Sequence, residues 1–390
     1  MSGGSAADIR SVRQITEKEN AKMKVLVLSC NTGEGHNSAA RAVREEFCRR
    51  GTPCDMVDAL GIVGAPNSRA ASAAYGSIIT HTPRLFGAIY RAGELYNSTG
   101  IQSPVYYANA AHAKKLGAFI EAGGYTHVVA THLFPMETMT RMRRAGTLHV
   151  PAYGVLTDYT RIPFWDETDL DAWFLPHSEV KTDCIHAGMP SERLYVTGLP
   201  VSARFSVPMT KAEARAALGI DAGARNILIM TGGVGCGNAP RLVDALLREI
   251  PADVTLTVLA GRNAEMKREL DARYAAGGRV TALPFTDRVD LWMHASDMVI
   301  TKPGGISTTE AAASRTPLIH TEAIPGCETK NAELFERLGM SMWAKSENDA
   351  ARCAALLLDD PARAERMTAA QAANIDPHGA ANVADLMERL

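Results

Sequence analysis

The sequence lacks several features that would place the protein in other classes. Its 390 residues carry a formal net charge of only −2, so no overall basic excess favours nucleic acid as a partner. No apolar run reaches the roughly 18 residues of a membrane span, and the polar first 22 residues lack the apolar segment of a signal peptide. We therefore expect a cytoplasmic protein that meets a membrane only from the cytoplasmic side, with residues 1–22 as a flexible leader.

Paired cysteines are also absent. The seven cysteines are scattered, with no C-x-x-C pair and no metal-ligand spacing. An odd, dispersed set of this kind is typical of reduced cytosolic thiols, most of which fill small apolar spaces.

The sequence does contain a repeated alternation of short apolar runs with amphipathic segments. The run "KVLVLS" precedes a helical stripe in which Ala39, Val43 and Phe47 recur every four residues. The expected strands are residues 24–29, 126–132, 151–158, 172–178 and 194–201 in the first half, and 226–231, 254–261, 280–285, 297–301, 317–322 and 340–345 in the second. This alternation predicts parallel sheets covered by helices on both faces.

Because the pattern starts twice, we expect an α/β protein of two doubly wound, Rossmann-like domains that face each other across a cleft. The expected parts are an N-terminal domain at 23–200, a linker near 199–210, a C-terminal domain at 201–370, and a C-terminal helix at 371–390 that packs back on the first domain. The segment 67–116 breaks the rhythm. It is either a helical excursion packed on its domain or an amphipathic surface for an acyl chain or a membrane interface.

The stretch "SCNTGEGHNSAARAV" places Gly33, Gly35 and His36 where a strand turns into a helix. Unpaired amides and the helix dipole favour negative charge at such a point. Because position 38 is serine and the Walker lysine is missing, the stretch indicates neither a dinucleotide site nor a P-loop. His36 is either a capping or packing histidine, or a general base that the helix N-terminus keeps neutral.

Two glycine-rich loops, "TGGVGCGN" at 231–238 and "KPGGISTTEAA" at 302–312, follow strands of the second half. Together they can cradle a diphosphate with amides and hydroxyls. Glu310 is expected either to accept both hydroxyls of a ribose or to stabilise its own helix dipole.

Three further side chains are candidates for the same site. Glu328 and Asn331 share one helix face, and are expected either to bind sugar hydroxyls or to belong to a simple cap. Phe285 ends a strand, where it either supports a flat base or packs in the core.

Taken together, "SCNTGEGHNSAARAV" and "ITKPGGISTTEAAASRTPLI" resemble the family 28 inverting glycosyltransferases of GT-B fold. Within that family the chain looks most like the diacylglycerol glycosyltransferases, which include bacterial processive glucosyltransferases and plant monogalactosyldiacylglycerol synthases. The resemblance extends from about residue 24 over nearly the whole chain. It implies donor binding in the second domain and acceptor binding in the first.

The resemblance also assigns roles to residues. His36 would be the catalytic base, and we expect Asp158 to support it. The donor-binding set is Gly232, Gly233, Gly235, Arg262, Phe285, Pro303, Gly304, Gly305, Ser307, Thr308, Glu310, Glu328 and Asn331. The acceptor-side set is Gly33, Gly35, Tyr159, Arg161 and Trp165.

One segment departs from the family. Relatives carry T-D-F/Y-x-x-H-x-x-W facing the acceptor, whereas this chain reads "TDYTRIPFW" at 157–165, with Ile162 in place of the histidine. Arg161 is a candidate to compensate for that loss. The acceptor therefore stays open between diacylglycerol and an isoprenoid-linked or soluble alcohol.

The resulting expectation is an inverting transferase that moves a hexose from UDP-glucose or UDP-galactose to a lipid acceptor, most readily diacylglycerol. The enzyme would be peripheral to the cytoplasmic face of the membrane. The resemblance implies that no cofactor or metal is needed in the site, and the sequence agrees, since no D-x-D pair stands in a plausible donor loop. Main-chain amides alone would hold the phosphates. The alternatives are a UDP-sugar epimerase, which can use the same two-domain fold, and a UDP-sugar sensor without chemistry.

Overall fold

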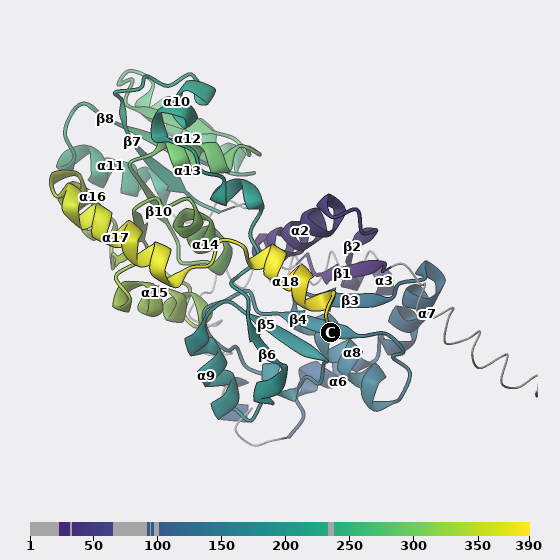
Figure 1. The fold of residues 1–390 in the computed structure, drawn as a ribbon. Coiled ribbons are helices and arrows are strands. Elements are labelled where there is room, and N and C mark those ends of the chain that lie inside the picture. Colours follow the sequence, from purple (N-terminus) through teal and green to yellow (C-terminus); the bar gives the residue numbers. More distant parts are fainter. Residues whose placement is uncertain (1–22, 32, 65–91, 94, 97–100, 233–237) are drawn as a thin grey trace, which may run out of the picture.

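The structure, a computed structural model, describes residues 23–31, 33–64, 92–93, 95–96, 101–232 and 238–390. Two α/β domains follow each other along the chain, and each is built on a six-stranded parallel sheet with helices on both faces (Figure 1). The predicted fold class is confirmed.

The first sheet has the strand order β2-β1-β3-β4-β5-β6. Its strands are β1 (Val25–Ser29), β2 (Cys54–Asp58), β3 (His127–Ala130), β4 (Ala152–Val155), β5 (Ala172–Leu175) and β6 (Leu194–Val196). The helices of this half are α2 (Glu34–Arg49), α3 (Ala59–Val63), α6 (Pro104–Ala110), α7 (Ala113–Gly123), α8 (Leu133–Arg144) and α9 (Ser178–His186). Short 3-10 turns occur at Trp165–Glu167 and Ser191–Arg193.

The packing of strand β1 explains why its first four residues are apolar. Val25 and Val27 pack on one side of the sheet with Phe47 of α2, whereas Leu26 and Leu28 pack on the other side in a cluster formed with α7 and α8. Alternate residues of a strand point to opposite faces, so a strand covered on both faces needs apolar residues at every position.

Strand β2 was not predicted. It lies at the edge of the sheet, pairs only with β1, and carries Asp55 and Asp58. Because four of its five residues keep some exposure, its sequence has no continuous apolar run.

The second sheet has the strand order β12-β11-β10-β7-β8-β9. Its strands are β7 (Arg225–Met230), β8 (Val254–Leu259), β9 (Val280–Leu283), β10 (Met298–Thr301), β11 (Leu318–His320) and β12 (Met342–Trp343). The helices are α10 (Lys211–Leu218), α11 (Ala239–Glu249), α12 (Ala264–Tyr274), α13 (Val289–Ala295), α14 (Gly305–Ala313), α15 (Cys327–Arg337), α16 (Glu347–Asp359) and α17 (Pro361–Asn374). Between the domains lies a 3-10 turn at Ala203–Ser206.

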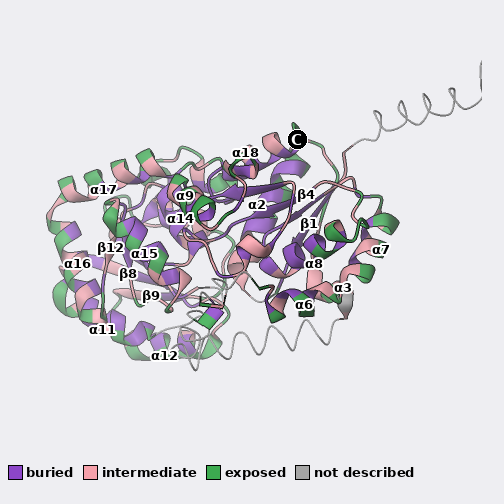
Figure 2. Ribbon diagram, turned by 90° about the horizontal axis from the view of Figure 1, so that it is seen from below, coloured by how far each residue is buried: buried purple, intermediate pink, exposed green. Residues whose placement is uncertain are grey.

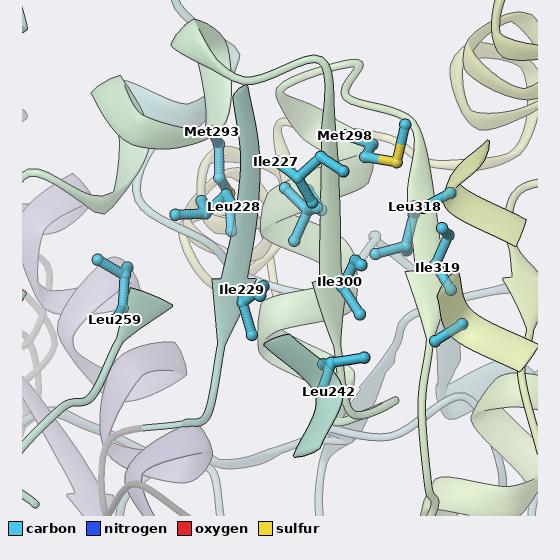
Figure 3. Close-up of a cluster of buried hydrophobic side chains, with 14 of the residues drawn as sticks. Ile227, Leu228, Ile229, Leu242, Leu259, Met293, Met298, Ile300, Leu318 and Ile319 are labelled. Atoms are coloured by element: carbon cyan, nitrogen blue, oxygen red, sulfur yellow. The ribbon is translucent and has the colours of Figure 1, made fainter. Parts of the chain in front are cut away.

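Buried aliphatic side chains form the core of the second domain (Figure 3). Ile227, Leu228 and Ile229 of β7 are at most 2% exposed, and they lie beside Ile300 of β10. In both domains the strands are largely buried, while the helices expose their outer faces (Figure 2). Each domain therefore has its own core.

Both strand orders place a switch point opposite the other domain. In the second sheet the chain proceeds from β7 towards one edge and from β10 towards the other edge, which is the Rossmann order. In the first sheet the direction of progress changes between the neighbouring strands β1 and β3. Ligands of such sheets bind beyond the carboxyl ends of the strands at these points. The loops after β1, β7 and β10 are the glycine-rich loops of the sequence.

The end of the chain crosses from one domain to the other. Helices α16 and α17 lie on the second domain, whereas α18 (Gly379–Met387) lies on the first, against α2 (Figure 1). Val383, Ala384 and Met387 join the cluster around Phe47, and Arg50 pairs with Asp385 at 2.6 Å. This crossing ties the two domains together.

The predicted insertion 67–116 falls largely outside the described residues. Its described end forms α6 and the start of α7. Tyr107 on α6 and Ile101 just before it are 62% and 64% exposed. Among the described residues, no helix combines the length and the apolar composition of a membrane span.

The two domains meet where α14 begins. A Cβ atom built on Gly305 would lie only 2.0 Å from the carbonyl oxygen of Thr157, so only glycine fits there. At the neighbouring Gly304, a Cβ atom would meet nothing closer than Oε1 of Glu328 at 3.8 Å.

We predict that Gly305→Ala destabilises the protein and that Gly304→Ala does not. The added methyl group of Gly305→Ala must push α14 away from the Thr157 backbone, and overpacking of this kind costs ~1–3 kcal/mol. Urea unfolding of the two variants measures the difference. Equal unfolding midpoints would show that the domains do not meet at this glycine.

Candidate functional site

A cleft lies between the domains at the carboxyl ends of their strands. Its volume is about 680 Å³, within the range of roughly 300–1,000 Å³ that ligand sites occupy. The first domain contributes the start of α2 and residues 157–158 after β4. The second contributes the loops after β7, β8, β9 and β10 and the start of α15.

His36 lies in the first turn of α2 and lines this cleft. Its Nδ1 atom is 2.8 Å from the carbonyl oxygen of Thr131 and 3.0 Å from Oγ1 of Thr157. Because a carbonyl oxygen can only accept, we assign the hydrogen to Nδ1. Nε2 then keeps its lone pair, which is the atom a general base needs.

The surroundings of His36 keep the ring uncharged. Burial lowers the pKa of His36 below its ordinary value, and Asp158 opposes that effect in part. The sequence prediction gave the helix N-terminus as the cause, whereas burial dominates. Burial likewise raises the pKa of Asp158, against the opposing effects of a hydrogen bond from Asn331 and of the charge on His36.

The loop after β10 presents backbone amides to the cleft. Gly304 caps α14 from an extended conformation, and Gly304, Gly305 and Ser307 all line the cleft. The first N–H groups of a helix have no partner inside it. With the helix dipole they favour an anion at this point.

The same loop also presents a cationic side chain to the cleft, beside its backbone amides. Lys302 lines the cleft, and its Nζ lies 3.1 Å from Oε1 of Glu328. Arg41, Arg204 and Arg262 also line it. Lys302 was visible in the sequence directly before the Pro-Gly-Gly of the loop, and Arg41 belongs to the glycine-rich stretch 29–43 around His36. Arg204 comes from the expected linker, which carried no signal.

Glu310 faces the cleft one turn inside α14. Burial raises the pKa of Glu310 to about 8, with a smaller opposing effect from Arg204 and Arg41. A carboxylate stabilised mainly by its helix dipole would show the opposite shift. The geometry therefore favours a ligand-facing role over a dipole-stabilising one.

Phe285 is 55% exposed at the cleft, so the core-packing alternative is wrong. The guanidinium group of Arg262 lies 5.2 Å from the centroid of its ring, a cation–π contact. Arg262 also pairs with Glu34 of α2 at 3.5 Å. Hence one arginine connects the aromatic platform with the opposite domain.

Glu328 and Asn331 lie on the same helix, α15, but have different surroundings. Glu328 lines the cleft, accepts from the N–H of Ile324 at 2.9 Å and pairs with Lys302. Asn331 is fully buried and does not line the cleft. Of the pair expected to bind sugar hydroxyls, only Glu328 therefore lines the cleft.

Four other predicted site residues are buried behind the cleft wall, namely Pro303, Thr308, Tyr159 and Trp165. Oγ1 of Thr308 lies 3.1 Å from Nε2 of His320. Trp165 packs in the apolar cluster of the first domain. These side chains shape the walls and make no direct contact with the cleft.

The departure at 161–162 also lies away from the cleft. Arg161 pairs with Asp166 at 2.8 Å, and Ile162 packs against the apolar cluster of the first domain. Arg161 therefore does not replace the missing histidine at the cleft surface.

The remaining predicted glycines divide into two groups. Gly33, Gly35 and Gly232 line the cleft, whereas Gly233 and Gly235 lie outside the described residues. Within the described ranges, no group of three or more His, Cys, Asp or Glu side chains is arranged to hold a metal ion.

Two family models match the chain, one for each domain. The monogalactosyldiacylglycerol (MGDG) synthase model matches residues 36–201, and the model of the glycosyltransferase family 28 C-terminal domain matches residues 226–389. The two facing Rossmann-like domains have the GT-B fold. Across both domains the chain is similar to the family 28 glycosyltransferases. It is a UDP-sugar-dependent hexosyltransferase.

Individual relatives agree with this assignment. A processive diacylglycerol beta-glucosyltransferase of Bacillus pumilus is 28% identical over 354 residues, which is 89% of this chain and 90% of that protein. MurG of Acinetobacter baumannii superposes with a TM-score of 0.61 at 14% identity, covering 94% of this chain and 100% of that one. Anabaena HepE in complex with UDP gives a TM-score of 0.56 at 15% identity, with the same coverage.

The raised pKa of Glu310 predicts a pH-dependent stability. Its ordinary value is 4.5 and its value in the folded protein is about 8, so between these limits the folded state binds more protons than the unfolded state. The contribution of Glu310 is fully present below about pH 4.5 and is lost as the pH rises to about 8. Urea unfolding at pH 5 and pH 8 should therefore show a larger loss of stability in the wild type than in Glu310→Gln. Parallel losses would mean that Glu310 titrates normally.

Proposed function

We propose that this enzyme transfers a hexose, from UDP-glucose or UDP-galactose, to the free hydroxyl of diacylglycerol with inversion at the anomeric carbon. The observation that carries the proposal is His36: a neutral imidazole with its Nε2 lone pair available, in the wall of the same cleft as the α14 N-terminus. The names of the curated relatives favour glucose, and the family model of the first domain favours galactose.

The donor would lie on the second domain. The amides that begin α14 and the ammonium group of Lys302 suit the two phosphates. Glu310 suits the ribose hydroxyls, because a carboxyl group in an apolar setting hydrogen-bonds strongly to them. The exposed ring of Phe285 offers a flat surface to the base.

The chemical step would be a direct displacement. Nε2 of His36 takes the proton of the acceptor hydroxyl while the oxygen forms its bond to the anomeric carbon. The bond from that carbon to the β-phosphate oxygen breaks, and its electron pair leaves with UDP. The helix amides and Lys302 would stabilise the developing negative charge, in the role that preorganised donors play at oxyanions.

Exposed apolar side chains support a lipid acceptor. Leu95, Ile101 and Tyr107 are 74%, 64% and 62% exposed, and all three lie within the predicted insertion 67–116 of the first domain. Large exposed apolar residues that gather in one region are typical of contact with lipid or another apolar partner. We propose that this region meets the cytoplasmic face of a membrane.

A product screen tests the function. UDP-glucose and UDP-galactose, each radiolabelled, are incubated with phosphatidylcholine vesicles that contain diacylglycerol, with soluble alcohols, and with no acceptor. We expect labelled glycolipid from the diacylglycerol vesicles and only slow hydrolysis without acceptor. An isomerised UDP-sugar in the last reaction would instead support an epimerase, and binding without any product would support a sensor.

Replacing His36 tests the base. His36→Ala should lower turnover by about 10² or more, because no other group takes the acceptor proton, and should leave the affinity for UDP nearly unchanged. Steady-state kinetics and calorimetric titration with UDP measure the two effects. Turnover that survives the substitution would exclude His36 as the base.

A further inference from the structure

The imidazole ring of His132 packs against the imidazole ring of His36. The two ring centroids lie 4.5 Å apart and the ring planes meet at 73°, an edge-to-face arrangement. Phe134 makes a second edge contact with the His132 ring, with centroids 4.5 Å apart and planes at 66°. His132 is 7% exposed and does not line the cleft. It is therefore a buried neighbour of the proposed base rather than part of the cleft wall.

The end of strand β3 brings the two rings together. Thr131 follows the strand and makes two hydrogen bonds to His36: its carbonyl oxygen accepts from Nδ1 at 2.8 Å, and its hydroxyl group donates to the carbonyl oxygen of His36 at 3.0 Å. The N–H of Thr131 donates to the carbonyl oxygen of Leu28 in β1 at 3.0 Å. Because His132 is the next residue, the sheet fixes the place of its ring relative to His36.

A capping hydrogen bond fixes the protonation of His132. This residue is the N-cap of α8, and its Nδ1 accepts from the N–H of Phe134 at 3.2 Å. Because a backbone N–H can only donate, Nδ1 carries no hydrogen and the hydrogen of the ring stands on Nε2. Burial also lowers the pKa of His132 well below its ordinary value, and the charge on His36 adds to that effect. His132 therefore places no positive charge beside a histidine that must accept a proton.

The ring contact has two consequences for His36. It restricts rotation of the imidazole, which the hydrogen bond to Thr131 holds at one nitrogen only, and it removes part of the ring surface from water. Burial is the main cause of the lowered pKa of His36. The titratable groups that act on this histidine are Asp158 and His132, and of these the structure shows the His132 ring in direct contact.

We propose that His132 is a positioning residue for the base: its neutral ring, held in place by the α8 cap, fixes the orientation of the His36 imidazole and excludes water from one side of it. This inference rests on the proposed role of His36 and adds to it a residue outside the cleft wall. A general base acts only when its lone pair points at the proton that it takes. A ring free to rotate would therefore lose turnover while the affinity for substrate stays the same.

Two substitutions of His132 separate the ring from the cap. His132→Asn removes the ring but keeps an acceptor for the N–H of Phe134, because asparagine is a preferred N-cap residue. His132→Phe keeps an aromatic ring beside His36 but removes that acceptor. Three properties are measured: the urea unfolding midpoint, kcat and KM for UDP-glucose with vesicles of phosphatidylcholine and diacylglycerol, and the NMR titration midpoint of the His36 ring, whose signals are those missing in His36→Ala.

In His132→Asn we expect kcat to fall about tenfold and KM to change by no more than about twofold, with an unfolding midpoint near that of the wild type. The His36 titration midpoint should rise by about half a pH unit, because water regains access to a ring whose pKa burial had lowered. In His132→Phe the unfolding midpoint should fall, while kcat and the His36 midpoint stay close to the wild-type values. An unchanged kcat in His132→Asn, or equal losses of kcat in both variants, would overturn the proposal.

The His36 midpoint keeps the test decisive where activity does not. A wild type that transfers no hexose would refute the proposed function, whereas a His36 midpoint that rises in His132→Asn would still support the ring contact. A midpoint that stays at the wild-type value in His132→Asn would overturn the proposal even if kcat falls, since a general loss of structure around α8 lowers kcat without exposing the ring. This comparison needs only His132→Asn, so it holds even if His132→Phe does not fold.

Discussion

The backbone contact between Gly305 and Thr157 is the constraint on which the site depends. The start of α14 reaches the main chain of the opposite domain because position 305 has no side chain. The same helix start offers its amides to the cleft, and the same acceptor-domain segment continues into Asp158. The contact therefore sets the spacing between the start of α14 and His36, which the Thr157 hydroxyl group touches. Reaction by direct displacement needs its partners about 3–3.5 Å apart, so a small displacement of this contact would carry a large cost in rate.

Most of the fold could be predicted because both sheets are parallel and covered on both faces. Such strands carry apolar residues at consecutive positions, as β1 and β7 do, and the strands predicted in the two halves of the sequence recur in the structure. The edge strand β2 could not be found in this way, since Asp55 and Asp58 interrupt its apolar pattern. The order of the strands was also beyond the sequence, because it depends on contacts between residues that lie far apart along the chain.

The candidate site was predictable where a residue follows the end of a strand. His36, Phe285 and Glu310 all belong to loops or helix starts that the strand pattern locates, and the structure brings them to one cleft. Asn331 shows the limit. Its spacing from Glu328 places both on one helix face, but spacing does not tell which neighbour covers that face: the cleft borders one residue and the opposite domain covers the other. Tyr159 was misassigned for the same reason, since its ring fills the contact between the domains.

Burial shifts the pKa values of His36 and Glu310 by one mechanism. Removing a group from water disfavours its charged form, which lowers the pKa of a base and raises that of an acid. Burial therefore favours the neutral form of both His36 and Glu310. For His36, neutrality is the state that accepts a proton. For Glu310, ribose hydroxyls that donate to the carboxylate would favour its charged form, so a bound nucleotide would reverse the effect of burial. In the proposed reaction, the free energy needed to ionise Glu310 would be drawn from donor binding, and His36 would stay neutral until the acceptor arrives.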